Sequence, residues 1–498
     1  MLIFQALCGI LLIIAGGYIF SENRRKIHWK TVVAGIFLQI SIAALILKGS
    51  WIASFLHFFS MPLYTALWIL AIQAFFLLLM VRFASRWSEI SLSWFKRIFW
   101  IELFFVAVRF NLIESFFDSI KMGAMKLRDY STVGAEFVYG ILGSKSSMDA
   151  ALVYHQDGLE KVKSVGFIFA FQVLPTIIFV ASLFAILYHL GIMQIMIRAI
   201  ASVIHKIMKA SGAETLSVAA NIFMGQTEAP LTIKPYLSKL TRSELFTIMV
   251  SGMAHCSAAI LVVYTAVSGA DARHLLTSVI MTAPGAIMLS KMMIPEIENP
   301  TTGSETTQAT LVAYDQPVNV IDAAARGASD GLNLAANVGA MLIAFIALMA
   351  LADGLYATLR EWLIALSASS FSWLPGTIKE GFGWLMSPIV FLTGIPWSES
   401  HAVGNLLGTK LVLNEFVAYV DLGSLMKNTS TMLSQKSFMI STYILCGFGS
   451  FASIAIQTGG IGALIPERRK ELAALGLKAV MVGVLSNLLA ASIAGILY

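Results

Sequence analysis

Long apolar runs separated by short polar stretches dominate the pattern of this 498-residue chain. A helix needs about 20 mostly apolar residues to cross the hydrocarbon core of a bilayer. Runs of this kind recur from the first residues to the last, so we predict about ten continuous spans. They lie at residues 2–20, 31–48, 61–82, 97–113, 165–188, 244–267, 274–294, 331–353, 437–458 and 474–497.

Composition supports this pattern. The chain is 58% hydrophobic and only 12% charged, whereas a soluble domain carries about twice that charged fraction. We therefore predict a polytopic, all-α membrane protein. The net charge of +6 is modest and reflects loop charges that orient the helices, so no nucleic-acid partner is expected. Cys8, Cys256 and Cys446 are too scattered for a disulfide framework or a zinc site.

Lysine and arginine residues predict the orientation of the spans. The basic loops at 21–30, 83–97 and 467–470 fall on one side of the membrane if the N-terminus lies outside. The C-terminus then lies outside as well. We predict a multi-pass protein of the inner (cytoplasmic) membrane with both termini outside.

Four stretches do not fit simple spans. Residues 110–128 are amphipathic and are expected along the outer interface, and residues 192–210 along the inner one. Residues 213–238 and about 396–425 are hydrophobic but interrupted by polar, Gly or Pro residues. These two regions occupy corresponding positions in the two halves of the chain, a pattern typical of a binding site built from inverted repeats.

The first interrupted region contains NIFMGQTEAPLTIKPYL, residues 221–237. Glu228 is followed by Ala229 and the helix-disturbing Pro230, and Asn221, Gln226 and Thr227 lie close by. A loop at the membrane edge would make such a glutamate harmless. We favour a re-entrant hairpin, because it offers acceptor side chains and free backbone carbonyls together.

The second region contains LNEFVAYVDL, residues 413–422, in which Asn414 and Glu415 again lie in an apolar run. A helix end at the interface is the alternative. We favour a second re-entrant hairpin, because this region corresponds in position to the first interrupted region. Two hairpins with acidic tips that enter from opposite sides can enclose a polar solute at mid-membrane.

Two further motifs remain open on physical grounds. CGFGSFASIAIQTGGIGAL, residues 446–464, carries Ser450 and Ser453 among small residues, which serve either close helix packing or binding. SGMAHCSAA, residues 251–259, places His255 within a span, where it is either a packed residue or a proton carrier. No HExxH, GxSxG or Walker A pattern indicates an enzyme, and no cofactor is expected.

Several motifs of the chain resemble those of the concentrative nucleoside transporter family. They are GQTEAPLTIKPYL, NEFVAY, CGFGSFASIAIQ, GGIGALIPERR, FIFAFQVLPTIIF and NVIDAAARGASDGLNLAANVGAMLIAFIAL. The resemblance covers residues 1–51 and about 110–498, and an insertion at about 52–108 reads as an added helical hairpin. It implies a homotrimer in which a mobile transport domain, with two re-entrant hairpins and two broken helices, moves like an elevator against a scaffold.

The resemblance also implies a division of the chain. Residues 1–190 are then scaffold-type helices, 191–294 the first transport half, 295–330 a cytoplasmic linker, 331–395 a scaffold-type span with an interfacial helix, and 396–498 the second transport half.

Site residues carry over by matching motif positions. Gln226, Thr227 and Glu228 match the first hairpin tip, which contacts the base and, through water, the ribose. Glu415 matches the ribose-binding acid of the second hairpin.

On the broken helices, Phe448 and Ser453 match site positions of the family. Asn221 matches a ligand of the coupling cation, which makes it the candidate sodium ligand, and the Met224 carbonyl would be another. Sodium-coupled members have a ribose-binding Asn where this chain has Ser450.

A hydroxyl ligand of sodium is replaced here by His255, with Cys256 next to it. Sodium prefers oxygen ligands, whereas an imidazole can carry a proton near neutral pH. We therefore expect cation-coupled uptake of nucleosides, with protons favoured over sodium as coupling ion. The alternatives are a transporter for another ribosylated or polar heterocyclic compound, and a channel or membrane enzyme.

Overall fold

The structure is a computed structural model that describes residues 2–49, 112–144, 146–148, 153–156, 159–162, 168–302, 317–366, 373–427 and 432–498. Within these ranges the chain is helical, apart from a short antiparallel pair of strands, β1 (Val153–Gln156) and β2 (Leu159–Val162). The helical membrane fold is thereby confirmed. The added hairpin at about 52–108, with the predicted spans 61–82 and almost all of 97–113, lies outside the described residues.

The N-terminal helices α1 (Leu2–Ile19) and α2 (Trp29–Leu47) pack against two long helices near the centre, α14 (Ala272–Met293) and α22 (Arg469–Leu497). The loop between α1 and α2, which contains η1 (Arg24–Lys26), is tied to this core by Glu22. Its carboxylate pairs with Arg242 at 3.0 Å and Lys478 at 2.7 Å. Partial burial opposes ionisation, but the hydrogen bond from Lys478 and the charge of Arg242 outweigh it and hold the pKa of Glu22 below its ordinary value.

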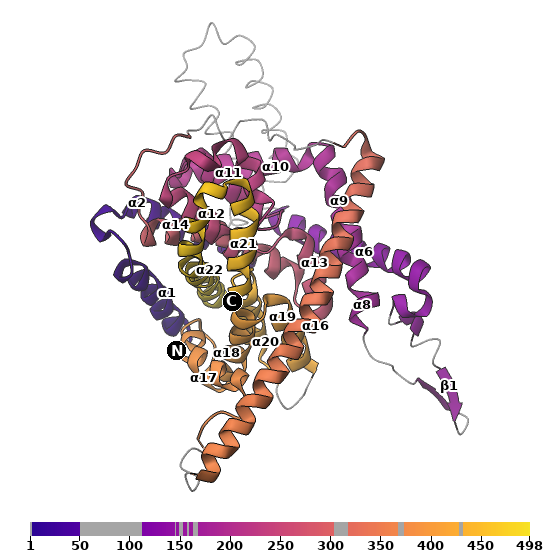
Figure 1. Ribbon diagram of the computed structural model, residues 1–498. Helices are drawn as coiled ribbons and strands as arrows, with labels where there is room; N and C mark the ends of the chain where they lie inside the picture. Colours follow the sequence, from indigo (N-terminus) through magenta and orange to yellow (C-terminus); the bar gives the residue numbers. More distant parts are fainter. Residues whose placement is uncertain are drawn as a thin grey trace, which may run out of the picture.

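A second group of helices lies to one side of this core (Figure 1). It contains α6 (Leu112–Tyr139), η3 (Gly140–Gly143), α8 (Phe169–Gln172), α9 (Leu174–His189) and α16 (Val320–Leu366). Helices α16 and α9 lie side by side along much of α9. A Cβ on Gly327 would meet Ala185 at 2.5 Å, and one on Gly331 would meet Ala181 at 2.8 Å. These glycines therefore permit the close approach of the two helices.

Two predictions in this group are wrong in their bounds. Helix α6 continues to Tyr139, beyond the expected interfacial segment 110–128. Helix α16 begins at Val320, inside the expected linker 295–330, and runs for 47 residues through the predicted span 331–353. The early start has a local cause: Asn319 accepts a hydrogen bond from the Asp322 N–H at 2.9 Å and so caps the first turn.

The remaining helices form two series with the same order of elements. The first consists of α10 (Ile192–Met208), the hairpin arms α11 (Gly212–Asn221) and η4 (Ala229–Lys239), the half-helices α12 (Arg242–Ala254) and α13 (Ala258–Ser268), and α14. The second consists of α17 (Ile378–Phe391), the hairpin arms α18 (Trp397–Val412) and α19 (Glu415–Lys427), the half-helices α20 (Gln435–Leu445) and α21 (Phe451–Leu464), the short turn η5 (Pro466–Arg468), and α22.

The predicted continuous spans 244–267 and 437–458 are wrong, because each is broken in the middle. Helix α12 ends at Ala254 and helix α20 at Leu445, and His255 and Cys446 have extended backbones. The freed carbonyls find partners from elsewhere in the fold: the Phe448 N–H donates to the His255 carbonyl at 3.2 Å. Breaks of this kind are tolerated at membrane depth where protein groups satisfy the backbone.

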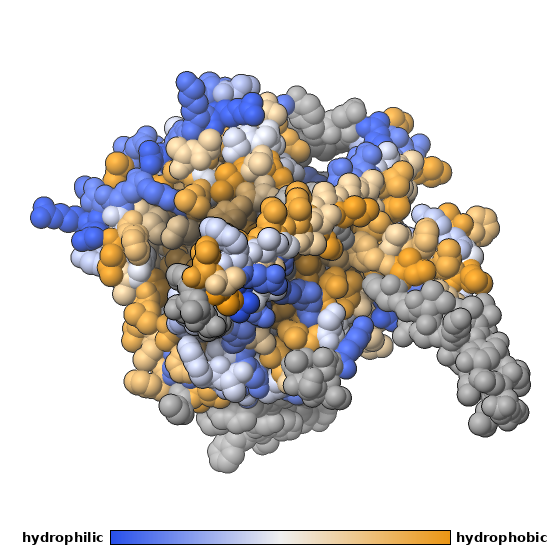
Figure 2. All heavy atoms as spheres, turned by 60° about the horizontal axis from the view of Figure 1, so that its bottom comes forward, coloured by the Kyte–Doolittle hydropathy of each residue, from blue (hydrophilic) through white to orange (hydrophobic). Residues whose placement is uncertain are grey.

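Five helices in the described part of the chain are long and apolar enough to cross a membrane: Leu2–Ile19, Trp29–Leu47, Phe169–His189, Ala272–Met293 and Pro466–Leu497. Hydrophobic side chains cover much of the face shown in Figure 2, with hydrophilic ones gathered at its edge and in a hollow near its centre. This distribution is typical of a membrane protein with a polar interior path.

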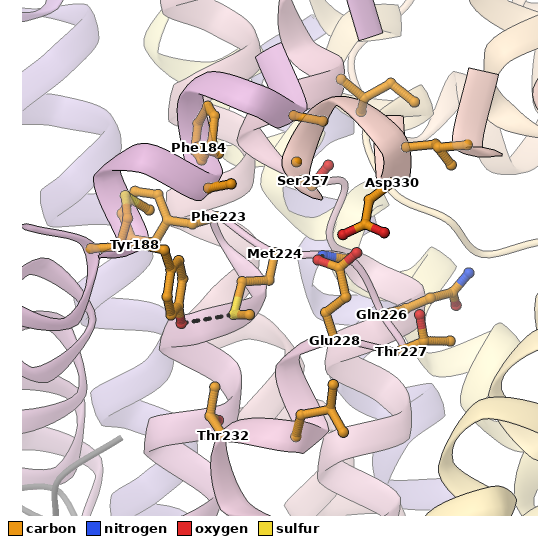
Figure 3. A pocket seen from close by; sticks show the side chains of 18 of the residues that line it. Phe184, Tyr188, Phe223, Met224, Gln226, Thr227, Glu228, Thr232, Ser257 and Asp330 are labelled. Atoms are coloured by element: carbon orange, nitrogen blue, oxygen red, sulfur yellow. Dashed lines mark hydrogen bonds between the residues drawn. The ribbon is translucent and has the colours of Figure 1, made fainter. Parts of the chain in front are cut away.

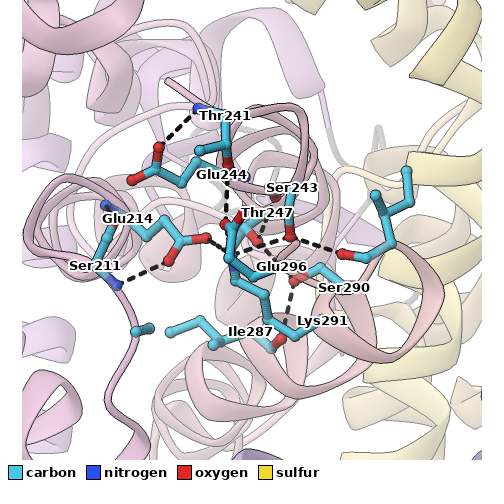
Figure 4. A network of polar contacts seen from close by, with 12 residues as sticks. Ser211, Glu214, Thr241, Ser243, Glu244, Thr247, Ile287, Ser290, Lys291 and Glu296 are labelled. Carbon is cyan, nitrogen blue, oxygen red and sulfur yellow. Dashed lines mark hydrogen bonds and ion pairs between the residues drawn. The ribbon is translucent and has the colours of Figure 1, made fainter. Parts of the chain in front are cut away.

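A buried ion network joins three elements of the first series (Figure 4). The Lys291 ammonium on α14 pairs with Glu214 of α11 and, at 2.9 Å, with Glu296, and donates to the Ser243 hydroxyl of α12 at 3.0 Å. Buried charges are tolerated when they are paired and hydrogen-bonded. The network fixes the base of the first hairpin against α12 and α14.

Candidate solute-binding site

A cavity of about 1090 Å³ lies between the tips of the two hairpins on one side and helices α9, α10 and α16 on the other. All the residues predicted to bind solute line it: Gln226, Thr227, Glu228, Glu415, Phe448, Ser450 and Ser453. Of the four predicted cation-site residues, Met224 lines the cavity, whereas Asn221, His255 and Cys256 are buried outside its lining. The fold therefore brings both acidic tips to one polar space.

The first hairpin turns at Gly225, and its tip is held by Glu228. The Glu228 carboxylate accepts a hydrogen bond from the Gly225 N–H at 3.2 Å and remains exposed to the cavity. Glu228 directly precedes η4, where Pro230 lies in the first turn. The backbone N–H groups of a helix start favour a negative charge, so this position suits a carboxylate that receives hydroxyl groups of a solute.

Helix α16 contributes a second acid to the same cavity. Asp330 and Glu228 point toward one another across the space between α16 and the hairpin tip (Figure 3). Tyr188 of α9 also lines the cavity, and its hydroxyl donates to the Met224 sulfur at 3.2 Å. The cavity lining therefore carries acidic groups from both α16 and the first hairpin, together with the basic side chains Arg198 and Arg326.

Gln226 is held in place by a buried partner on the broken helix. The Gln457 side-chain amide donates to the Gln226 Oε1 at 3.1 Å and to the Met249 carbonyl at 3.1 Å. With its oxygen engaged, the Gln226 amide keeps its NH₂ for a solute acceptor. Thr227 packs closely over the same helix, because a Cβ on Gly460 would meet its Cγ2 at 2.6 Å.

At the second hairpin tip, Glu415 begins helix α19 and is buried, with 6% of its surface exposed. Its Oε1 accepts a hydrogen bond of 2.8 Å from the Tyr264 hydroxyl on α13. The Tyr264 ring stacks on Tyr419 with a centroid separation of 4.3 Å. Asn414 caps the helix by accepting from the Val417 N–H at 2.9 Å. Glu415 is thus positioned by both series.

The break before α21 supplies the floor of the cavity. Ser450 and Ser453 are buried and their hydroxyl oxygens lie 3.1 Å apart, with Ser453 donating to the Phe448 carbonyl. Phe448 lines the cavity beside them. The Ser450 hydroxyl therefore already has a protein partner, whereas a longer amide side chain here would reach further into the cavity.

Two of the four predicted cation-site residues, Asn221 and His255, meet at Ser251 behind the first hairpin tip. Asn221 donates to the Ser251 hydroxyl at 3.2 Å, and the His255 Nδ1 lies 2.8 Å from the Ser251 carbonyl. A carbonyl only accepts, so Nδ1 carries the hydrogen and Nε2 of the neutral ring is an acceptor. Asn221 Oδ1 and His255 Nε2 are both buried and unpartnered within the described residues. Each of these buried acceptors lacks a donor, so each is a candidate to bind a cation or a proton.

Cys256 lies against Cys446, with their sulfurs 3.2 Å apart. The two breaks therefore meet in the centre of the fold, although 190 residues separate them in the chain. The described residues contain no group of three or more His, Cys, Asp or Glu that could hold a metal ion. The side-chain oxygen of Asn221 and the oxygen atoms beside it remain the candidate sodium ligands.

Sequence reasoning missed Tyr264, Gln457 and Asp330. Asp330 lies among other polar residues of α16, in a motif that served only for the family resemblance. Gln457 was visible as a polar side chain near the end of CGFGSFASIAIQ, seven positions after Ser450. Tyr264 carried no such signal, because a tyrosine in a membrane helix is ordinary.

Comparisons with known proteins agree with this geometry. Three family profiles match in order: Na+ dependent nucleoside transporter N-terminus at residues 8–67, nucleoside recognition (Gate) at 170–270, and Na+ dependent nucleoside transporter C-terminus at 274–495.

Curated relatives are similar over most of the chain. The uncharacterized transporter YutK of Bacillus subtilis is 37% identical over 98% of this chain and 98% of its own length. The nucleoside permease NupC of Helicobacter pylori is 36% identical over 78% of this chain and 91% of its own. The sodium/nucleoside cotransporter 1 of Rattus norvegicus is 37% identical over 66% of this chain and 51% of its own.

Solved structures of CNTnw share the fold. The inward-facing substrate-bound state has a TM-score of 0.77 and 31% identity, covering 100% of this chain and 98% of that one. A variant in an outward-facing state has a TM-score of 0.78 and 32% identity, with the same coverage. These relatives are transporters and not enzymes. With both acidic hairpin tips on one cavity and these matches along its length, the chain belongs to the concentrative nucleoside transporter family.

Proposed function

We propose that this chain takes up nucleosides across the inner membrane by alternating access, driven by an inward cation gradient in which protons act more than sodium. One observation carries the proposal: Glu228 and Glu415, from hairpins in different halves of the chain, reach the same cavity. Carboxylates accept hydrogen bonds from neighbouring hydroxyls, and the Gln226 amide matches the polar edge of a base.

The placement of the cavity supports an elevator-like movement. One wall consists of the hairpin tips and broken helices, and the other of α9, α10 and α16. If the hairpins and broken helices move as one body, the solute travels along the α16 wall. CNTnw has structures in inward-facing, intermediate and outward-facing states. We propose the same cycle here, in a homotrimer with both termini outside.

The two unmatched acceptors support coupling to a cation. Asn221 Oδ1 and His255 Nε2 lie behind the tip that carries Glu228. A proton on Nε2 or a small cation on Asn221 would satisfy them and stiffen the tip for solute binding. Because the imidazole stands where sodium-coupled members of the family have a hydroxyl, we infer that protons are the main coupling ion.

The test is uptake by proteoliposomes of radiolabelled purine and pyrimidine nucleosides, other ribosylated compounds and free bases. Each is measured with an inward proton gradient without sodium, an inward sodium gradient at equal pH, and no gradient. We expect accumulation of a nucleoside that an ionophore abolishes. Glu415→Gln should lose it, and Glu361→Gln, an exposed residue of α16 that does not line the cavity, should keep it.

Other results would redirect the proposal. If only the other ribosylated compounds accumulate, the solute belongs to that class and is not a nucleoside, and the proposed binding site is retained. Equilibration without accumulation under every gradient would contradict coupling and favour a channel.

A further inference from the structure

A second buried lysine lies in the core of the fold and forms no ion pair with a carboxylate among the described residues. Lys410, in the last turn of the hairpin arm α18, is fully buried. Its ammonium donates to the Ile444 carbonyl at 2.9 Å and to the Asn487 Oδ1 at 2.9 Å. Within the described ranges no carboxylate lies within 4.0 Å of it, in contrast to Lys291, which pairs with Glu214 and Glu296.

Burying an ammonium group among neutral atoms costs several kcal/mol unless oxygens take over its hydration. Here the oxygens come from a helix end. Ile444 lies in the last turn of α20, whose terminal carbonyls have no partner within the helix and carry the negative end of its dipole. Lys410 is therefore bound much as a free cation would be, by carbonyl and amide oxygens at the C-terminal end of a half-helix.

The first series has the same construction without a lysine. Its hairpin arm α11 ends at Asn221, beside the C-terminal end of α12. The side chains of Asn221 and His255 hydrogen-bond only to Ser251 among the described residues, which leaves Asn221 Oδ1 and His255 Nε2 unmatched. At the place where the second series has an ammonium, the first has unfilled acceptors.

Asn487 of α22 links the two places. Its amide nitrogen donates to the Ala254 carbonyl of α12 at 2.8 Å and to the Cys446 carbonyl, while its oxygen receives the Lys410 ammonium. A single amide thus ties the ends of both half-helices to the lysine. Loss of the positive charge would leave the Asn487 oxygen and the Ile444 carbonyl without their donor.

We propose that the Lys410 ammonium is a built-in cation, which occupies in the second repeat the place that a free coupling cation occupies in the first, and which positions the second hairpin tip with Glu415. The equivalence of the two places rests on the proposed coupling function. The positioning of the tip rests on the contacts alone, because Lys410 and Glu415 belong to the same hairpin.

The experiment removes the ammonium and returns it as a small ion. Lys410→Ala and Lys410→Met are purified in detergent beside the unchanged protein. Nucleoside affinity and melting temperature are measured at fixed pH and ionic strength in methylammonium chloride or, as the control, in tetramethylammonium chloride, whose cation is too bulky for the vacated space. Binding in detergent needs no gradient, so leakage of ammonia through a membrane cannot confuse the result.

We expect Lys410→Ala to lose about tenfold or more in affinity, as removal of a charged hydrogen-bond donor does. Methylammonium should restore several-fold of that affinity and raise the melting temperature of Lys410→Ala. It should do neither for the unchanged protein nor for Lys410→Met, in which the side chain fills the space without a charge. Purification of Lys410→Ala only in the presence of methylammonium is the same rescue and supports the proposal.

Normal affinity in Lys410→Ala or in Lys410→Met would overturn the proposal, because the charge would then be dispensable. The proposal would also be overturned if Lys410→Ala folds and methylammonium neither raises its melting temperature nor restores its nucleoside affinity. If Lys410→Ala cannot be purified at all, the affinity of Lys410→Met decides: loss supports a cationic role and retention overturns it. If the unchanged protein binds no nucleoside, the proposed function fails, while the melting temperatures still decide whether the place takes a cation.

Discussion

The Tyr264 hydroxyl donates a 2.8 Å hydrogen bond to the Oε1 of Glu415, and so joins the broken helix of the first repeat to the tip of the second hairpin. Both residues are buried. This hydrogen bond and the stack of Tyr264 on Tyr419 therefore link the position of α13 to that of the second hairpin.

Tyr264→Phe should remove this bond and leave the stack on Tyr419 intact, since the ring is unchanged. A hydrogen bond to a charged group is worth about 1.5–3 kcal/mol, so we expect nucleoside affinity to fall roughly ten- to a hundredfold. Equilibrium binding in detergent measures it, with melting temperature as the control for folding. An unchanged dissociation constant would mean that Glu415 is held by other contacts.

Glu228→Gln and Glu415→Gln should each reduce affinity by about ten- to a hundredfold without preventing membrane insertion, because an amide replaces a charged acceptor of similar shape. Glu228 is exposed to the cavity, so its substitution should leave stability unchanged. Glu361→Gln serves as the matched control. If both variants bind and transport normally, the solute lies elsewhere.

The hairpins could be predicted from sequence because each combines an acid with Gly, Pro or Asn in an apolar run, a combination that a simple span does not tolerate. The two breaks could not be placed by hydropathy, because residues 256–257 and 446–450 are small or apolar and His255 is a single polar residue in an apolar run. They are fixed by tertiary contacts such as the one from Asn487 to Ala254, 233 residues away.

The long helix α16 shows a different limit. Hydropathy marks only the apolar part of a helix, at 331–353, whereas the cap at Asn319 and the alanine-rich turns that follow extend it at its N-terminal end. Lys410 was overlooked for a related reason. It lies within the predicted second hairpin, where the sequence indicates no partner for its charge, and only the fold shows it buried beside Asn487.

Gln457→Ala should weaken the hold on Gln226 and so alter the recognition of the base more than that of the sugar. A neutral hydrogen bond contributes about 0.5–1.5 kcal/mol, so affinity should fall by roughly two- to tenfold. A panel of nucleosides that differ only in the base measures the effect. Equal losses for every base, or none, would contradict a role in positioning Gln226.

Gly447→Ala should destabilise the protein. Gly447 has a φ of +152°, and a Cβ here would meet the Ala254 carbonyl oxygen at 2.5 Å and the Asn487 oxygen at 2.7 Å. The strain is on the order of 1–3 kcal/mol, which should lower the melting temperature measurably. Gly459→Ala is the matched control, since a Cβ at this position of α21 meets nothing within 4 Å. Equal melting temperatures for the two variants would show that the backbone around Gly447 accommodates the added methyl group without loss of stability.

We propose that the identity of the coupling ion depends on His255. Its Nδ1–H is committed to the Ser251 carbonyl, and Nε2 is a buried acceptor without a partner in the described structure. We propose that a proton binds at Nε2 and that an acid which reaches the cavity, Glu228 or Glu415, compensates its charge. Proton binding and solute binding are then linked, as coupled transport requires.

His255→Ser should therefore exchange one coupling ion for another. The hydroxyl restores an oxygen ligand beside Asn221 Oδ1 and removes the proton acceptor, which favours sodium. We expect uptake by the unchanged protein to follow a proton gradient and to respond weakly to sodium, and uptake by His255→Ser to show the reverse. Proteoliposomes with imposed gradients, and melting temperatures in sodium against choline, measure both. Strong sodium dependence of the unchanged protein would falsify proton coupling. Proton-driven uptake that survives His255→Ser would move the carrier to Glu228 or Glu415, the acids that reach the cavity.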